Sequence, residues 1–157
     1  MVNGGAKGIR TEEPLDISAI RRVVDVPFIG LYKIDIPGYK ARITLTFEAT
    51  KEVVKACAYI VALDAALRPR PKGLTAYELI KRIKKELEVP VMANISAFEE
   101  RVKAFEAGAD LATTIACHTL YTLDRPKPDL ELLQRLVEEI SVPMIAEGHY
   151  HTPRIKR

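Results

Sequence analysis

The sequence has few of the features that mark secreted or membrane-spanning proteins. Its 157 residues include two cysteines and no tryptophan. No apolar run approaches the ~20 residues that span a bilayer. The first residues lack the charged and then apolar segments of a signal peptide, so the cysteines predict reduced thiols and not a disulfide framework. We therefore expect a cytoplasmic protein with no membrane partner.

An excess of charge of one sign is also missing. The 24 lysines and arginines nearly balance the 21 acidic residues, which leaves a net charge of +3. The basic residues lie mostly on the outer faces of predicted helices, so the charge predicts no nucleic-acid partner. No Gly-x-Gly-x-x-Gly or Walker-type loop occurs, and a nucleotide-binding fold therefore has no support. The 48% of hydrophobic residues is enough to bury a core.

The sequence does contain a regular alternation of apolar strands and amphipathic helices. Val-Pro precedes an apolar run three times, at Pro27, Pro90 and Pro143. Proline stops a helix and is tolerated at the first residue of a strand. Strands that are apolar on both sides favour a parallel sheet covered by helices, either a barrel or a doubly wound sheet. The predicted strands are 6–10, 27–33, 59–64, 91–94, 111–114 and 144–147.

Periodic apolar residues predict helices between these strands. In the first helix, Leu15, Ile17, Ile20, Val23 and Val24 form the predicted core-facing stripe. Further stripes run over 79–87, 102–109 and 130–140.

Most of the predicted strands end in a polar or charged side chain. In a parallel barrel these carboxyl ends meet at one mouth, where the active site lies. We therefore expect the following side chains round one pocket: Arg10, Lys33, Asp64, Asn94, Thr114 and Glu147.

Lys33 is the strongest catalytic candidate. It follows an apolar run, so burial at the barrel edge and a neighbouring cation such as Arg10 would favour the neutral amine, which can remove and return a proton. A structural ion pair with a carboxylate is the alternative. Glu147 could orient a sugar hydroxyl or take part in proton transfer, while Arg10 and Asn94 could hold substrate oxygens.

Further motifs carry weaker expectations. The basic stretch 68–72 could meet a phosphate or pair with acidic residues, and a solvated loop is the default interpretation. His149 and His151 lack a third metal ligand, so we expect a surface loop and no metal site. Cys117 and His118 are adjacent and would face apart, which argues against a nucleophilic pair.

With these residues in place, the sequence resembles the bacterial N-acetylmannosamine-6-phosphate 2-epimerases of sialic-acid catabolism. The resemblance covers nearly the whole chain in the right order. Its most specific strings are 62–65 with 68–71, and 145–148 with Thr152 and Pro153; the other matching stretches are 4–10, 27–33 with Asp35 and Pro37, 43–46, 92–96 and 113–114.

The resemblance implies a (β/α)8 barrel of the TIM type that inverts C2 of an N-acetylhexosamine 6-phosphate without metal or organic cofactor. It implies that Lys33 is the catalytic base, Glu147 an active-site glutamate and Arg10 a substrate-binding arginine. The Gly148 amide would help to hold the phosphate. Asp64, Asn94 and Thr46 lie in matching stretches and are the further substrate-binding candidates.

The sequence also departs from the family pattern. The family usually has Asp where this chain has Asn94, and Ala116, Cys117 and His118 replace Ser, Gly and Tyr. A complete barrel needs at least ~200 residues, so we expect residues 1–157 to form one partial barrel domain with about strands 2 to 7. Open sheet edges predict a homo-oligomer. Two alternatives to an epimerase remain, namely a non-catalytic fragment that serves as a binding or structural module, and another phosphosugar barrel enzyme such as an aldolase or a ketose-phosphate epimerase.

Overall fold

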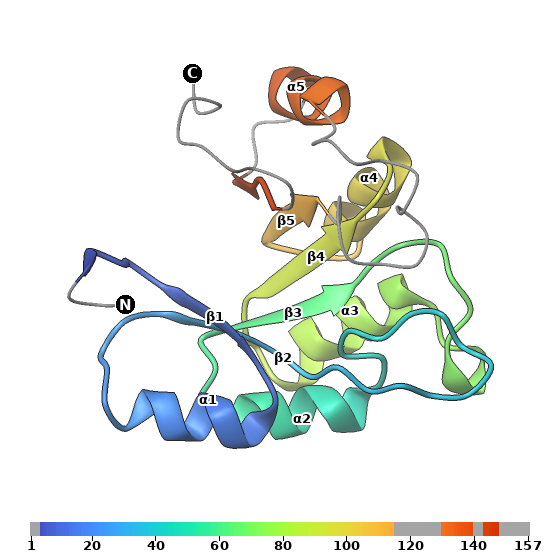
Figure 1. Cartoon of the computed structure of the whole chain (residues 1–157). Coiled ribbons are helices and arrows are strands. Elements are labelled where there is room, and N and C mark those ends of the chain that lie inside the picture. The colour runs from blue at the N-terminus through green and yellow to red at the C-terminus, as the bar shows by residue number, and fades with distance from the viewer. Residues whose placement is uncertain (1–3, 115–129, 140–142, 148–157) are drawn as a thin grey trace.

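The computed structural model describes residues 4–114, 130–139 and 143–147 (Figure 1). Strands and helices alternate along this part of the chain. The strands are β1 (Ile9–Glu12), β2 (Phe28–Leu31), β3 (Ile60–Asp64), β4 (Val91–Ile95), β5 (Leu111–Thr114) and β6 (Met144–Ile145). The α-helices are α1 (Pro14–Arg21), α2 (Phe47–Lys55), α3 (Ala76–Glu86), α4 (Phe98–Glu106) and α5 (Leu130–Glu139), and a short 3-10 helix, η2, covers Pro71–Gly73.

The six strands form one parallel sheet whose spatial order is the sequence order, β1 to β6. The sheet curls into an arc, and the helices pack on its outer side (Figure 1). A doubly wound sheet would reverse its strand order at a switch point, which this sheet does not do in the described residues. The predicted fold class, an incomplete (β/α)8 barrel, is therefore confirmed.

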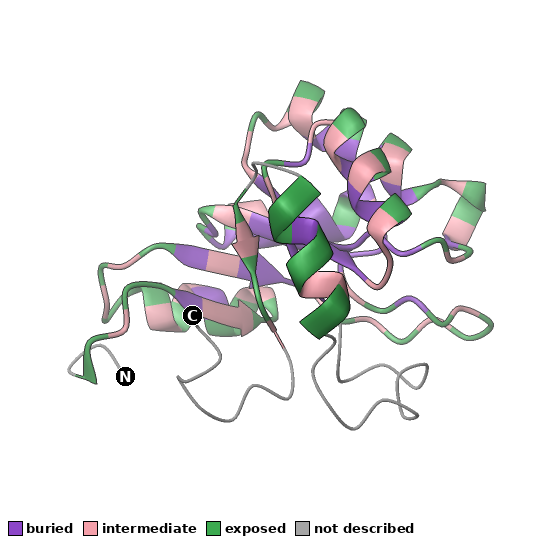
Figure 2. Cartoon of the chain, turned by 90° about the horizontal axis from the view of Figure 1, so that it is seen from above, coloured by how far each residue is buried: buried purple, intermediate pink, exposed green. Residues whose placement is uncertain are grey.

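The largest core lies between the outer face of the sheet and the helices. Leu79, Ile80 and Ile83 of α3 are fully buried in it, as the amphipathic pattern predicted. They pack with the outward-facing residues of β4, which are Val91, Ala93 and Ile95. Figure 2 shows the buried strands at the centre of the molecule and the exposed residues on the outer surfaces of the helices.

A second, smaller apolar layer lies on the inner face of the arc. Leu31, Ala62 and Met92 are buried there, with Ile29, Ile43, Ile60 and Leu111 packed against them. Because side chains alternate along a strand, each inward residue is followed two positions later by another inward residue. The inner apolar layer therefore lies directly below the polar residues at the carboxyl ends of the strands, on the same face of the sheet.

The structure corrects two predictions made for the first βα unit. β1 begins at Ile9 and ends at Glu12, so Arg10 lies within the strand and not at its end. Ile17 of α1 is buried, but Leu15 and Val23 are 82% and 78% exposed and do not face the core. An apolar stripe predicts an amphipathic helix, but the stripe alone does not show which of its residues a neighbour covers.

Glycine has a packing role in β2. A Cβ atom on Gly30 would lie 2.6 Å from the Cβ of Ala58 and 2.8 Å from Cγ1 of Val53. α1 also approaches here, with Cδ1 of Ile17 at 2.9 Å from the same point. The absence of a side chain at residue 30 thus allows α1 and α2 to pack closely on the sheet.

α4 and α5 are joined through a buried arginine that the sequence pattern did not predict. The Arg101 side chain is fully buried, and its Nη1 donates a hydrogen bond to the carbonyl of Leu136. Glu100 is also buried and accepts hydrogen bonds from Leu67 N (2.8 Å) and Ser96 N (2.7 Å). These contacts fix the loops that follow β3 and β4. In the described part of the chain, no helix is long and apolar enough to cross a membrane.

Candidate active site

The carboxyl ends of the strands bring polar side chains together on the inner face of the arc. Register partners in a parallel sheet share a face, and Asp64, Asn94 and Thr113 are successive partners on β3, β4 and β5. On β1, Arg10 and Glu12 are the partners of the inward residues Ile29 and Leu31. The inward threonine is Thr113 and not the predicted Thr114, because the alternation of β5 turns Thr114 to the other face.

An ion pair joins β1 to the segment just after β6 across the mouth. Nη1 of Arg10 contacts Oε2 of Glu147, although 136 residues separate them in the chain. Thr113 donates a hydrogen bond from Oγ1 to Oε2 of Glu147 at 3.3 Å, and Oγ1 of Thr114 donates to the Glu147 carbonyl at 3.1 Å. Burial lowers the pKa of Arg10, and the charge of Glu12 opposes that shift. Arg10 and Glu147 therefore lie together at the mouth, a pairing that the strand-end pattern did not predict.

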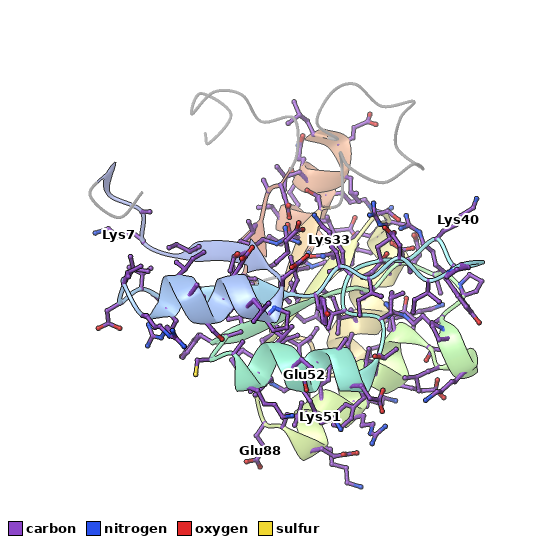
Figure 3. The ribbon with its side chains drawn as sticks, turned by 60° about the horizontal axis from the view of Figure 1, so that its bottom comes forward. Lys7, Lys33, Lys40, Lys51, Glu52 and Glu88 are labelled. Carbon is purple, nitrogen blue, oxygen red and sulfur yellow. The ribbon has the colours of Figure 1, made fainter. Side chains whose placement is uncertain are left out.

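Lys33 lies just after β2, within the arc of strands. Figure 3 shows it there, while Lys7, Lys40 and Lys51 lie at the periphery. Its backbone forms an antiparallel bridge with Ile43, and its Nζ pairs with Oε2 of Glu12. The lysine side chain is 44% exposed. The surroundings of Lys33 thus differ from the expected ones, because a carboxylate and not Arg10 is its charged partner and the side chain is only partly buried.

Asp64 and Asn94 are both 1% exposed, and they use their polar atoms differently. Asp64 accepts hydrogen bonds from Ala66 N at 3.0 Å and from Arg68 Nη1 at 3.1 Å. Burial raises the pKa of the Asp64 carboxyl, and the charge of Arg68 counteracts part of that rise. Neither polar atom of the Asn94 amide has a hydrogen-bond partner among the described residues. A buried amide without partners is costly, so Asn94 offers a donor and an acceptor to a bound polar ligand.

The arginines of the predicted basic loop form an ion pair and a hydrogen bond with neighbouring segments. Arg68 pairs with Asp64, which corresponds to the acidic-pairing interpretation of this segment and not to a solvated loop. Arg70 is 3% exposed and donates from Nη1 to the Leu45 carbonyl at 3.2 Å. Burial lowers the pKa of Arg70.

Two threonines before α2 have structural contacts. Thr46 is the N-cap of α2, and its side chain accepts a hydrogen bond from Ala49 N at 3.1 Å. Its predicted role in substrate binding stays a prediction. Thr44 is fully buried; its Oγ1 donates to the Ala62 carbonyl at 2.7 Å and accepts from Tyr32 N at 3.1 Å. This hydroxyl links the residue just after β2 to β3 by hydrogen bonds.

Sequence reasoning missed Glu12 and Thr44. The signal for Glu12 was present, because a charged residue two positions after Arg10 falls on the same face of a strand. Thr44 gave no comparable signal, since its role depends on a contact with another strand. Several predictions fall outside the described residues, namely those for Gly148, for Ala116, Cys117 and His118, and for His149 and His151.

Comparison with known proteins shows which family the chain belongs to. The family model described as "Putative N-acetylmannosamine-6-phosphate epimerase" matches residues 1–157. A relative of that name (as 2-epimerase) from Caldanaerobacter subterraneus is 44% identical over 152 residues, which cover 96% of this chain and 64% of the relative. One from Clostridioides difficile is 40% identical over 154 residues, which cover 98% of this chain and 69% of the relative. The chain thus spans about two thirds of the length of the curated relatives it matches.

Solved structures agree with the sequence comparison. The N-acetylmannosamine-6-phosphate 2-epimerase from Clostridium perfringens superposes with a TM-score of 0.89 at 33% identity, covering 98% of this chain and 67% of that one. The thiamine phosphate pyrophosphorylase from Pyrococcus furiosus superposes with a TM-score of 0.56 at 20% identity, which shows a shared fold alone.

Proposed function

Because the chain belongs to the N-acetylmannosamine-6-phosphate epimerase family, we propose that its residues encode the interconversion of N-acetylmannosamine 6-phosphate and N-acetylglucosamine 6-phosphate. The substrate is a small phosphosugar, and the pathway is amino-sugar and sialic-acid catabolism. The observation that carries the proposal is the position of Lys33 within the arc, where its Nζ pairs with Glu12. Glu12 lies on the same face of β1 as Arg10, the partner of Glu147. The proposed reaction needs a base that faces polar groups able to hold a sugar.

The proposed reaction is a proton transfer at C2. In the open-chain sugar the C1 aldehyde acidifies the C2 proton, and the neutral amine of Lys33 removes it. The C–H electron pair moves into the enolate, whose negative charge rests on the C1 oxygen. The ammonium of Lys33 then returns a proton to the other face of C2, which regenerates the aldehyde and the neutral amine.

The remaining side chains of the mouth would hold the sugar in place. Glu147 would orient a hydroxyl or take part in proton transfer, and Arg10 would bind substrate oxygens. The unpartnered amide of Asn94 could pair with one further hydroxyl, since its two polar atoms point into the inner face. Asp64 and Thr46 remain candidates for substrate binding, and the backbone of Gly148 for phosphate binding.

The test is a direct assay of the chain with N-acetylmannosamine 6-phosphate. Proton NMR would follow the appearance of N-acetylglucosamine 6-phosphate, with circular dichroism to show that the protein is folded. We expect the second sugar to accumulate to an equilibrium mixture. Folded protein that leaves the substrate unchanged at high concentration would refute the proposal and favour a non-catalytic binding or structural module.

A different phosphosugar barrel enzyme gains no support from the relatives that this chain matches. An aldolase from Escherichia coli superposes with a TM-score of 0.55 but is only 13% identical, so it shows the fold alone. Cleavage of the carbon chain in the assay with N-acetylmannosamine 6-phosphate would nevertheless reveal an aldolase.

We also propose that the chain is cytoplasmic and self-associates. Its exposed apolar side chains on or beside α1 and α5 support self-association, because large apolar groups in contact with water favour burial between subunits. They are Leu15, Val23, Leu130 and Val137.

A further inference from the structure

The carboxylate of Glu12 meets the amine of Lys33 from the neighbouring strand. We propose that Glu12 is a positioning residue for the base, which holds Nζ of Lys33 over the mouth and compensates the ammonium charge during the reaction. This inference rests on the proposed function. It assigns a role to a residue that neither the strand-end pattern nor the family resemblance picked out.

The backbone places both groups with little freedom. Glu12 is the last residue of β1 and pairs in register with Leu31, so it lies on the inner face. The next amide, Glu13 N, donates to the Leu31 carbonyl at 3.0 Å and closes the end of the ladder. On the other side, Ile34 N donates to the Arg42 carbonyl at 3.0 Å, directly after Lys33. The two side chains therefore start from fixed points, one at the end of β1 and the other just after the adjacent strand β2.

Four charged side chains on β1 and just after β2 and β6 form two ion pairs. Arg10 pairs with Glu147, and Glu12 pairs with Lys33. Burial lowers the pKa of Arg10 and the charge of Glu12 opposes that shift, so this carboxylate acts on both cations. Asp64 on β3 already pairs with Arg68. Among the described residues, Glu12 is thus the carboxylate in contact with the proposed base.

This contact matters because a lysine side chain is long and flexible. Its four-carbon stem carries about 2 kcal/mol of rotamer entropy, and here it is 44% exposed. A base that swings toward solvent leaves the reacting carbon, and a misplacement of about 1 Å can lower the rate about a hundredfold. When Lys33 takes the C2 proton, its new positive charge forms next to the Glu12 carboxylate. The same ammonium then remains in place to give the proton back.

An exposed ion pair of this type contributes little to folding. Such pairs stabilise proteins by about 0–1 kcal/mol, so removal of Glu12 should change the unfolding midpoint only slightly. A purely structural surface pair would leave the reaction rate unaffected as well. The proposal therefore predicts a loss of rate without a matching loss of stability.

The kinetic test compares Glu12→Ala and Glu12→Gln with Glu13→Gln as the control, which removes the same charge one residue away. We expect Glu12→Ala to lower kcat about tenfold or more while KM changes less than about threefold. Glu12→Gln keeps a hydrogen-bonding group of the same size and should recover part of the rate. An unchanged kcat in Glu12→Ala, in an active wild-type background, would overturn the proposal.

A second readout does not depend on activity. Trinitrobenzenesulfonate labels accessible amines, and mass spectrometry can compare labelling of Lys33 with labelling of Lys7 in the same molecules. Loss of the ion pair frees the Lys33 amine from its carboxylate partner, so we expect Glu12→Gln to raise this ratio about two- to tenfold and Glu13→Gln to leave it unchanged. An unchanged ratio in Glu12→Gln would overturn the inferred contact. An inactive wild type with a raised ratio would instead refute the proposed function, and with it the kinetic role, while the contact itself would stand.

Discussion

The charges at the mouth of the arc satisfy one another across strands. Arg10 with Glu147, Glu12 with Lys33, and Arg68 with Asp64 form three pairs from β1, β3 and the segments after β2, β3 and β6. Asn94 sits beside Asp64 in the register and keeps both polar atoms unpaired among the described residues. Individual substitutions in this set should therefore affect chemistry and stability differently.

Asp64 gives a prediction about stability against pH. Its pKa is raised in the folded protein chiefly by burial, which means that folding disfavours its ionised form. The stability that protonated Asp64 gives the wild type relative to Asp64→Asn is therefore complete below the pKa of Asp in the unfolded chain, which is about 3.9. This stability is lost as the pH rises through the pKa of Asp64 in the folded protein.

Urea unfolding of wild type and Asp64→Asn between about pH 4 and pH 7 would measure this difference. We expect the free energy of unfolding of the wild type to fall relative to that of Asp64→Asn as the pH increases. Asp35→Asn is a suitable control, because Asp35 pairs with Arg42 on the exposed surface. A wild type that gains stability over Asp64→Asn with rising pH would contradict the account of Asp64.

At the scale of elements, the segment with Ile43 and Thr44, which precedes α2, links the end of β2 to β3. Thr44 bonds to β3 through the Ala62 carbonyl and to the chain just after β2 through Tyr32 N. Ile43 forms the backbone bridge with Lys33, and its carbonyl accepts a hydrogen bond from Asp64 N at 3.0 Å. This segment thus sets the position of the proposed base as well as the packing of the sheet.

We predict that Thr44→Val lowers both stability and activity. Valine has the shape of threonine but leaves a buried amide and a buried carbonyl without their partner, which costs about 2 kcal/mol. For a protein of this size that corresponds to a fall of roughly 4–8 °C in Tm. Thr44→Ser, which keeps the hydroxyl, should lose less than half as much by calorimetry. Equal losses in the two variants would show that the methyl group, and not the hydroxyl, matters.

Strand positions could be predicted from the sequence where apolar runs have sharp boundaries. β3, β4 and β5 lie within one residue of their predicted limits, because the runs before Asp64 and Asn94 are apolar on both faces. The predicted limits of β1 were wrong because Thr11 and Glu12 make its C-terminal half polar, so the apolar run appeared to end at Arg10. β6 is also shorter than predicted, since it ends at Ile145 and not at Glu147.

Contacts between distant segments could not be predicted from the sequence. The inward direction of Asp64, Asn94 and Glu147 follows from strand alternation, and the sequence pattern indicated their shared location. The choice of partners did not follow, because Glu12 and Arg101 acquire theirs only when separate elements meet. A charged residue is normally assigned to the surface, and the buried Arg101 shows where that assumption fails.

At the scale of the whole molecule, the exposed apolar residues on and just after α1 predict self-association. Sedimentation equilibrium should give a mass that is a multiple of the 17.5 kDa chain. Replacement of Leu15 and Val23, which are 82% and 78% exposed, by glutamate should weaken the assembly because charge opposes burial. Leu67→Glu, at a 62% exposed loop residue, is the control. A monomer of wild-type protein at every concentration would contradict this prediction.

The central claim is that Lys33 moves the proton at C2, and deuterium exchange tests it most directly. With N-acetylmannosamine 6-phosphate in deuterated water, proton NMR would measure the loss of the C2 signal. We predict exchange by the wild type, unchanged exchange by Lys7→Ala, and at least about a hundredfold loss in Lys33→Ala. Exchange that persists in folded Lys33→Ala at the wild-type rate would show that another group is the base and would contradict the account.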